Sequence, residues 1–380
     1  MSVEEDFFEE QTEQSKVKTR IVTKYCRAWS RVLIGYLRKS GKPVHLRFVD
    51  LLSGPGRYKD GAASTPIKIL ELAIGADDLR DSLETIFNDR DYRSELERNI
   101  TDIPNIDTLR YKAKISGTKL IDESDFYTTA GIDGSDPVPT LYFIDPWGYK
   151  EVSRDVISKL IEPFGCDCIF FLNLKRVNAA FGDPTKRQPL DRIFGQKEAS
   201  ELATRLDSAV STKERHDLIL SQLEASLKAG SAKYVTFFRI LDEHDNVSHC
   251  LVSVSKNPKA FEIMKKIYTG ESSGHVAGLF EYKPSEILQP SLLFDNGLGN
   301  LKARLLSKFA GERHRFKAIY DSDHVNTNYT QANYREAIAE LEEEDKIFVV
   351  PSMQQRARGA IITCGPDTMI TFPEQTTDGQ

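Results

Sequence analysis

The 380-residue sequence lacks long apolar runs and contains only five cysteines. Its longest apolar stretches, such as CIFFLNL at residues 168–174, fall well short of the roughly 18 residues that cross a bilayer, so we expect no membrane span. The cysteines do not have zinc-ligand spacing, since Cys166 and Cys168 form a C-x-C pair that is too close for an ordinary zinc knuckle. The N-terminal segment is acidic, unlike a secretory leader. We therefore expect a protein of the reducing cytoplasm.

Several catalytic signatures are also missing. The seven histidines include no H-x-x-x-H pair, which argues against a metal site. The sequence has no G-x-x-x-x-G-K-[ST] segment, so a P-loop nucleotidase is not expected. Ser53 does not stand in a G-x-S-x-G motif, which argues against a serine hydrolase. A nuclease remains an alternative, because the catalytic acids of nucleases are often far apart in the sequence.

Charge is distributed unevenly along the chain, although the net charge is only −6. Residues 1–15 carry six acids and no base, which predicts an acidic tail, whereas residues 16–49 carry ten Lys or Arg and no acid. Within the basic block, apolar residues recur at helical spacing from Val17 to Tyr36. The bases of the predicted helix follow a different stripe: Arg20, Lys24, Arg27 and Arg31.

This basic stripe has two interpretations. It could be an ordinary solvated helix face, or it could bind the phosphate backbone of DNA or RNA, because clustered positive charge without local acids attracts polyanions. The acidic tail just upstream could shield it. Both interpretations stay open on the sequence alone.

From residue 44 onward, strand and helix patterns alternate, which predicts right-handed crossovers and a doubly wound, mostly parallel α/β sheet. The apolar run TLYFI at residues 140–144 is typical of a buried parallel strand. After a long helix expected around residues 198–228, the segments AKYVTFFRIL and VSHCLVSVS are joined by a short polar turn, which predicts an antiparallel hairpin. Parallel strands, a helix and a terminal hairpin are the order found in class I S-adenosylmethionine-dependent methyltransferases. We place this domain at residues 16–285.

The order of helix and strand patterns in residues 295–380 predicts a separate winged-helix-like domain of three helices and a hairpin. Thr330 is expected to cap the third helix, and the hairpin is expected to pair KIFVVPS (346–352) with AIITC (360–364). Arg356 and Arg358 at the hairpin tip could meet phosphate, but the second half of the third helix is acidic. For this module we therefore favour contact with another protein over readout of DNA.

The end of the first predicted strand carries Asp50, Ser53, Gly54 and Gly56. Nucleotide-like ligands lie across the carboxyl ends of parallel strands, where glycines allow close backbone approach. An acid there can hold an ammonium group and would repel a pyrophosphate, which favours a methionine-derived cofactor over a dinucleotide. At the end of the second strand, Asp89 could accept hydrogen bonds from ribose hydroxyls or could cap the next helix.

The fourth strand is followed by Asp145, Pro146 and Trp147. A carboxylate, a rigid proline and an aromatic ring can hold a planar amine, because the carboxylate accepts the N–H while the ring stacks on the base. The alternative is a strand-ending turn with tryptophan in the core. We favour the functional role for this motif because it lies beside the expected cofactor cleft.

These motifs together resemble the three-Cys-motif partner protein family (TcmP). The resemblance rests on the basic N-terminal helix ending in Tyr36–Leu37, on FVDLLSGPGRYKDGAASTP, TLYFIDPWG and FFLNLKRVN, and spans about residues 16–370. It implies a methyltransferase-like fold, S-adenosylmethionine as cofactor, and a partner whose cysteine cluster resembles that of radical S-adenosylmethionine proteins. By this resemblance the loop from Asp50 to Gly56 holds the methionine moiety, Asp89 the ribose, and Asp145–Trp147 an acceptor amine.

Two functions follow as expectations. The first is methylation of an amine on a nucleic-acid base, with the base leaving its helix or presented in a single strand. The second is a non-catalytic component that binds nucleic acid or a partner in a two-gene system, such as an antiphage one.

Overall fold

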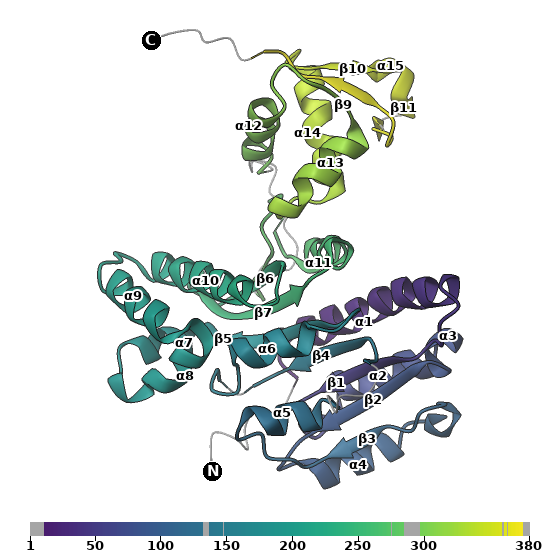
Figure 1. Cartoon of the computed structure of the whole chain (residues 1–380), viewed down its shortest axis with the longest axis vertical. Helices are drawn as coiled ribbons and strands as arrows, with labels where there is room; N and C mark the ends of the chain where they lie inside the picture. Colours follow the sequence, from purple (N-terminus) through teal and green to yellow (C-terminus); the bar gives the residue numbers. More distant parts are fainter. Residues whose placement is uncertain are drawn as a thin grey trace. The chain divides into compact units, whose positions relative to one another are not determined.

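The computed structural model describes residues 11–131, 137–146, 148–274, 276–284, 297–358, 361–362 and 364–374 (Figure 1). Trp147 and most of the acidic tail lie outside the described residues. The chain divides into two compact units. The first comprises Met1–Ile267 with Glu281–Ile287, and the second Tyr268–Phe280 with Leu288–Gln380.

The first unit is built on an eight-stranded sheet with the order β3-β2-β1-β4-β5-β7-β6-β8. Strands β1 to β5 are parallel, while β7 is inserted antiparallel between β5 and β6. The predicted α/β fold with a mostly parallel sheet and a hairpin is therefore confirmed. The strands are β1 Leu46–Asp50, β2 Leu83–Asn88, β3 Lys114–Ser116, β4 Thr140–Ile144, β5 Asp167–Asn173, β6 Tyr234–Leu241, β7 Val247–Ser255 and β8 Glu281–Tyr282.

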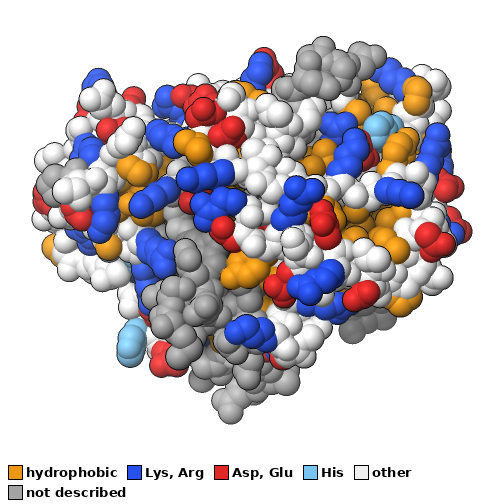
Figure 2. Space-filling view, turned by 90° about the horizontal axis from the view of Figure 1, so that it is seen from below, with side chains coloured by type: hydrophobic (Ala, Val, Ile, Leu, Met, Phe, Trp, Pro, Cys, Tyr) orange, Lys and Arg blue, Asp and Glu red, His pale blue; other side chains and the backbone are white. Residues whose placement is uncertain are grey.

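Helices cover both faces of this sheet (Figure 1). They are α1 Glu13–Lys39, α2 Thr65–Ile74, α3 Asp77–Arg80, α4 Arg93–Thr101, α5 Glu123–Thr129, α6 Arg154–Ile161, α7 Leu174–Phe181, α8 Arg187–Phe194, α9 Gln196–Asp207, α10 Thr212–Ala229 and α11 Pro258–Glu271. No helix among the described residues is long and apolar enough to cross a membrane. On the face shown in Figure 2, Lys and Arg side chains are interspersed with Asp and Glu.

The single long helix expected at residues 198–228 is wrong, because the segment forms α9 and α10 with a break between them. Ser211 caps α10 by accepting a hydrogen bond from the Glu214 amide at 3.1 Å. The Glu214 carboxylate accepts in return from the Val210 amide at 2.8 Å. These two hydrogen bonds at the N-terminal end of α10 start a new helix.

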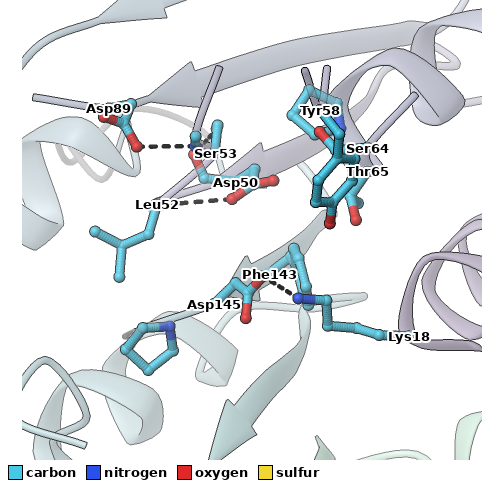
Figure 3. A pocket seen from close by; sticks show the side chains of 13 residues that line it. Lys18, Asp50, Leu52, Ser53, Tyr58, Ser64, Thr65, Asp89, Phe143 and Asp145 are labelled. Carbon is cyan, nitrogen blue, oxygen red and sulfur yellow. Dashed lines mark hydrogen bonds and ion pairs between the residues drawn. The ribbon is translucent and has the colours of Figure 1, made fainter. Parts of the chain in front are cut away.

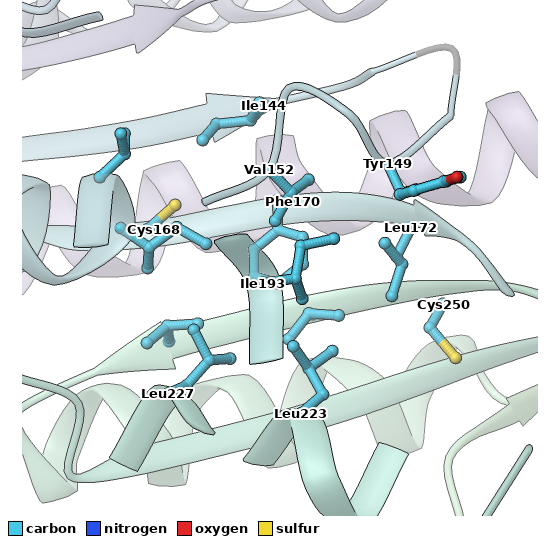
Figure 4. Close-up of a cluster of buried hydrophobic side chains, with 14 of the residues drawn as sticks. Ile144, Tyr149, Val152, Cys168, Phe170, Leu172, Ile193, Leu223, Leu227 and Cys250 are labelled. Atoms are coloured by element: carbon cyan, nitrogen blue, oxygen red, sulfur yellow. The ribbon is translucent and has the colours of Figure 1, made fainter. Parts of the chain in front are cut away.

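Successive side chains along each strand point to opposite faces of the sheet, so two layers of buried side chains form. Val49, Tyr142 and Phe170 point to one face and belong to one cluster with α6 and α10 side chains such as Val156 and Leu223. Figure 4 shows part of this cluster, with Phe170 of β5 and Leu223 and Leu227 of α10. The intervening residues of the strands point to the opposite face, since successive strand residues alternate.

Helix α1 crosses that opposite face. The Tyr25 hydroxyl donates to Asp167, the first residue of β5, at 2.8 Å, and the Trp29 indole donates to the Gly165 carbonyl at 3.1 Å. The N-terminal turns of α1 therefore lie toward the carboxyl ends of the strands. Two residues of the predicted apolar stripe, Val32 and Tyr36, are instead 43% and 47% exposed.

The second unit has three main helices and a three-stranded antiparallel sheet with the order β10-β13-β9. Its elements are α12 Gly299–Lys308, β9 Arg313–Arg315, α13 Phe316–Asp323, α14 Gln331–Glu343, β10 Phe348–Val350, α15 Met353–Arg356, β11 Ala357–Arg358, β12 Ile361–Ile362 and β13 Met369–Thr371. This is the arrangement of a winged helix, with a third helix, α14, capped by Thr330 as predicted.

The predicted pairing of the wing hairpin is wrong. Strand β10 pairs with β13, and Ile361–Ile362 pairs instead with Ala357–Arg358. The observed register places Val349 opposite Ile370, and both side chains enter the core of the second unit. Burial of this apolar pair therefore selects the more distant strand.

A buried carboxylate joins the helices of the second unit. Asp323 is fully buried and accepts hydrogen bonds from Arg304 of α12 at 2.7 and 3.0 Å, from Lys308 at 2.7 Å and from the Tyr334 hydroxyl of α14 at 2.7 Å. Burial opposes its ionisation, but these donors outweigh burial and lower the pKa of Asp323 to about 2.

We predict that Asp323→Asn lowers the free energy of unfolding of the second unit by about 3 kcal/mol at pH 7, because it removes the buried charge that Arg304, Lys308 and Tyr334 all contact. The difference in free energy of unfolding between the parent and the variant should shrink as pH falls from about 4 toward 2. Over this range the Asp323 carboxylate of the parent itself becomes protonated. Hydrogen exchange resolved to residues 304–334 measures this effect. Asp321→Asn, which breaks only an exposed pair with Lys317, is the control and should change stability by less than about 1 kcal/mol. Equal effects of the two variants would contradict the prediction.

Candidate functional site

A polar site lies at the carboxyl ends of β1 and β4. These two strands are neighbours, and β2 continues the sheet on the other side of β1, so strand order reverses here. Such a switch point is the usual ligand site of a doubly wound sheet. Asp50 is the last residue of β1 and Asp145 follows β4 directly, and both line one pocket with Lys18 of α1 (Figure 3).

The loop after β1 has the backbone conformation that its glycines allow. Gly54 and Gly56 have φ of 63° and 84°, in the left-handed region that favours glycine. A Cβ on Gly56 would also lie 3.0 Å from the Leu96 side chain. Ser53 is used within the turn, since its hydroxyl donates to the Asp50 carbonyl at 3.1 Å. The loop thus presents its backbone to the pocket.

Asp50 is almost completely buried and accepts a hydrogen bond from the Leu52 amide at 3.2 Å. Burial, followed by repulsion from Asp145, raises the pKa of Asp50 well above its ordinary value. The Leu52 amide and Lys18 offset this only in part. The positive charge near this carboxyl group is therefore too small to offset its burial and the repulsion from Asp145.

Lys18 was not among the residues singled out from the sequence, yet it occupies the centre of the site. Its side chain is 4% exposed, and its ammonium donates to Asp145. Burial alone would lower the pKa of Lys18, but Asp145, Tyr58 and Asp50 together raise it. Lys18 is therefore a buried cation that partly neutralises two carboxylates.

Aromatic rings complete this side of the site. The Lys18 ammonium lies 4.7 Å from the centre of the Phe171 ring, a cation–π distance. Phe171 also stacks on His249 with a centroid separation of 5.0 Å. Burial and the nearby cations Lys18 and Lys175 lower the pKa of His249 to about 4, so its imidazole is neutral at pH 7.

Asp89 joins two loops through backbone amides. Its carboxylate accepts from the Gly54 amide at 2.8 Å, from Asp91 at 3.0 Å and from Tyr92 at 2.9 Å. The amides of Asp91 and Tyr92 lie just before α4, so Asp89 holds the turn that leads into this helix, whose N-cap residue is Tyr92. Asp89 also lines the pocket, so the ribose role stays a prediction.

Two cavities meet at Leu52 and Asp89. The cavity around Asp50 and Asp145 has a volume of only ≈ 30 Å³. The adjoining cavity has a volume of ≈ 370 Å³ and is lined by Leu52, Asn88, Asp89, Arg90, Asp91, Tyr92, Thr118, Lys119, Leu120 and Glu151. Leu52 and Asp89 therefore belong to the walls of both cavities. Among the described residues, no cluster of His, Cys, Asp and Glu suits a metal ion.

The predicted nucleic-acid contacts are distributed unevenly. Arg20, Lys24 and Arg31 on α1 are exposed, whereas Arg27 is half-buried and pairs with Asp78 at 2.7 Å. Arg356 is buried, pairs with Glu342 and donates to the Pro351 carbonyl at 2.8 Å, so its guanidinium is not presented to a phosphate. The Arg358 side chain lies outside the described residues.

Comparison with known proteins finds a family match for part of the chain. A family model described as a GMT-like wHTH (winged helix-turn-helix) domain matches residues 281–352, which supports the winged-helix assignment of the C-terminal part. No curated protein matches the chain.

We predict that Lys18→Met lowers the free energy of unfolding by about 3 kcal/mol at pH 7, because it leaves buried carboxylates without their cation. Adding Asp145→Asn should recover part of this loss, with a coupling energy of about 1–3 kcal/mol in a double-mutant cycle measured by urea unfolding. The control pair is Lys159→Met with Glu162→Gln, which removes an exposed ion pair. Strictly additive effects of the Lys18 and Asp145 substitutions would contradict the proposed pairing.

Proposed function

We propose that the chain is an S-adenosylmethionine-dependent methyltransferase acting on an amine of a nucleic-acid base. The observation that carries the proposal is the charge of the site. Asp50, Asp89 and Asp145 line the pocket with Lys18 as the one base among the described lining residues. A site with excess buried carboxylate favours a ligand that brings positive charge, and S-adenosylmethionine carries an ammonium and a sulfonium.

The arrangement of the cavities supports this cofactor. The ≈ 370 Å³ cavity beside Asn88 and Asp89 has room for an adenosine, and the loop at Gly54 and Gly56 leads from it to Asp50. In this proposal Asp89 accepts from the ribose and Asp50 holds the ammonium. Because the cavity at Asp145 is small, Lys18 has to withdraw before an acceptor can enter.

When bound, the cofactor supplies an electrophilic methyl group. The residues of this chain then have the task of orienting the acceptor. Once released from Lys18, Asp145 accepts a hydrogen bond from the acceptor N–H and directs the nitrogen lone pair toward the methyl group. Proximity and alignment supply most of the rate, so no strong base is required. Trp147, outside the described residues, remains the predicted stacking partner of the base.

The substrate class rests on two further features. Exposed basic side chains on α1 offer positive charge close to the pocket. The C-terminal part of the chain matches a winged helix-turn-helix model. Proteins with this motif commonly place a helix in a nucleic-acid groove. The acids at the C-terminal end of α14 are partly neutralised within the module, since Lys302 pairs with Glu340 of the helix and with Glu344, which follows it.

A non-catalytic, partner-binding role is the second candidate. Its support is a groove of ≈ 340 Å³ on the α1 side of the sheet, away from the pocket. Three exposed apolar side chains flank it: Val32, Tyr36 and Phe164. Exposed apolar surface of this kind often marks a protein contact. The three-Cys-motif protein implied by the sequence resemblance is the partner we propose for it.

We predict that calorimetry detects S-adenosylmethionine binding to the full chain, with affinity rising as pH increases through the raised pKa of Asp50. The reason is that a cationic ligand binds the ionised carboxylate, so at lower pH a proton must first be removed. Asp50→Asn should weaken binding about tenfold or more and abolish this pH dependence.

The control for this experiment is Asp155→Asn, which alters an exposed carboxylate of the same unit. Absence of binding by the parent protein would overturn the methyltransferase proposal. Binding without methyl transfer to DNA, RNA or partner protein would favour the second candidate.

A further inference from the structure

A basic groove runs between α1 and the segment that leads into α2. It has a volume of ≈ 580 Å³ and is lined by Gln11, Lys16, Thr19, Arg20, Thr23, Lys24, Ala62, Ala63 and Lys68. We propose that this groove holds the phosphate backbone of a single-stranded nucleic acid and leads the strand to the pocket. The inference rests on the proposed function and specifies where its substrate binds.

Basic side chains from two helices line the groove. Lys16, Arg20 and Lys24 follow one another at four-residue spacing along α1, so they share one face of the helix. Lys68 comes from α2. Among the described residues that line the groove there is no Asp or Glu. The charge of the groove therefore complements a polyanion.

The ion-pair partners of Lys16 and Lys68 do not compete strongly with phosphate. Lys16 pairs with Glu13 at 2.7 Å and Lys68 with Glu71 at 2.8 Å, and all four side chains are more than two-fifths exposed. Exposed pairs within a helix contribute about 0.3–0.5 kcal/mol each. Exchange of such a pair for a phosphate contact thus costs little.

The groove adjoins the pocket through a direct contact between their walls. Thr19 lines the groove and Thr65 lines the pocket, and their hydroxyls lie 3.2 Å apart. Ala63 of the groove is likewise followed by Ser64 of the pocket. A strand held by its backbone in the groove has its bases within short reach of Asp145.

The chemistry of the lining favours the backbone over the bases as the bound part. No aromatic side chain lines the groove among the described residues, so it offers no stacking platform for bases. Its lining includes the small side chains Ala62 and Ala63, which allow a chain to approach closely. Arg27, which pairs with Asp78, lies outside the groove lining.

The test is fluorescence anisotropy of a labelled single-stranded oligonucleotide with the full chain over a series of salt concentrations. Each phosphate contact to a single strand contributes a slope of about −0.7 in log K against log salt. The double variant Lys16→Gln with Lys68→Gln should lower the magnitude of the slope by about 1.4 and weaken binding at low salt. The control variant Lys159→Gln with Lys197→Gln removes two exposed bases of α6 and α9 and should leave the slope unchanged.

The outcomes separate this inference from the proposed function. If the slope is unchanged in the Lys16 and Lys68 variant, and circular dichroism shows that this variant is folded, the proposal that the groove binds the phosphate backbone is overturned. A slope equally reduced in the control variant also overturns it, because the effect would then reflect net charge alone. The groove variant could lower the slope while calorimetry shows no S-adenosylmethionine binding by the parent protein. That result would support nucleic-acid binding in the groove and would overturn the methyltransferase proposal.

Discussion

The ion pair between Lys18 and Asp145 is the interaction on which the candidate site depends. It places an ammonium group with almost no exposure at the point where strand order reverses. Removing a cation from water is costly unless it is paired, so the surrounding carboxylates and the Phe171 ring are what make this burial tolerable. The same cation restrains the repulsion between Asp50 and Asp145.

The course of α1 makes this ion pair possible. Hydrogen bonds from Tyr25 and Trp29 hold the helix across the sheet toward the amino end of β5, and its first turns therefore reach the carboxyl ends. Lys18 faces the pocket, while Lys16 and Arg20 face the adjoining groove. One helix thus brings together the residue that closes the pocket and the bases that line the groove.

Much of the fold was predictable from the sequence because it depends on local patterns. Alternating apolar strands and helices predicted the parallel sheet, and Thr330 with Asn333 marked the start of α14. The wing pairing was not predictable in this way, since the choice of β13 over nearer residues is decided by burial of Val349 against Ile370 across a loop. The break before α10 did have a local signal, the N-cap residue Ser211 followed three residues later by Glu214.

The candidate site was predicted in part. Strand ends located Asp50, Asp89 and Asp145, because carboxyl ends of parallel strands meet at one edge of the sheet. Lys18 was missed because it was grouped with the basic block, yet it lies at helical spacing from Ile21, Val22 and Tyr25, all of which are buried. A lysine on an apolar stripe signals a buried partner, and in this fold that partner is Asp145.

The burial of every cysteine has a consequence for how the molecule can be probed. All five thiols are free and buried, and burial raises the pKa of Cys26 and Cys250 to about 12 and that of Cys166 to about 11. Such thiols are protonated and shielded at neutral pH, so they react only when the surrounding structure opens. Four of them belong to the first unit, and Cys364 belongs to the second. The chain thus carries a native reporter of local opening in each unit, with no engineered label.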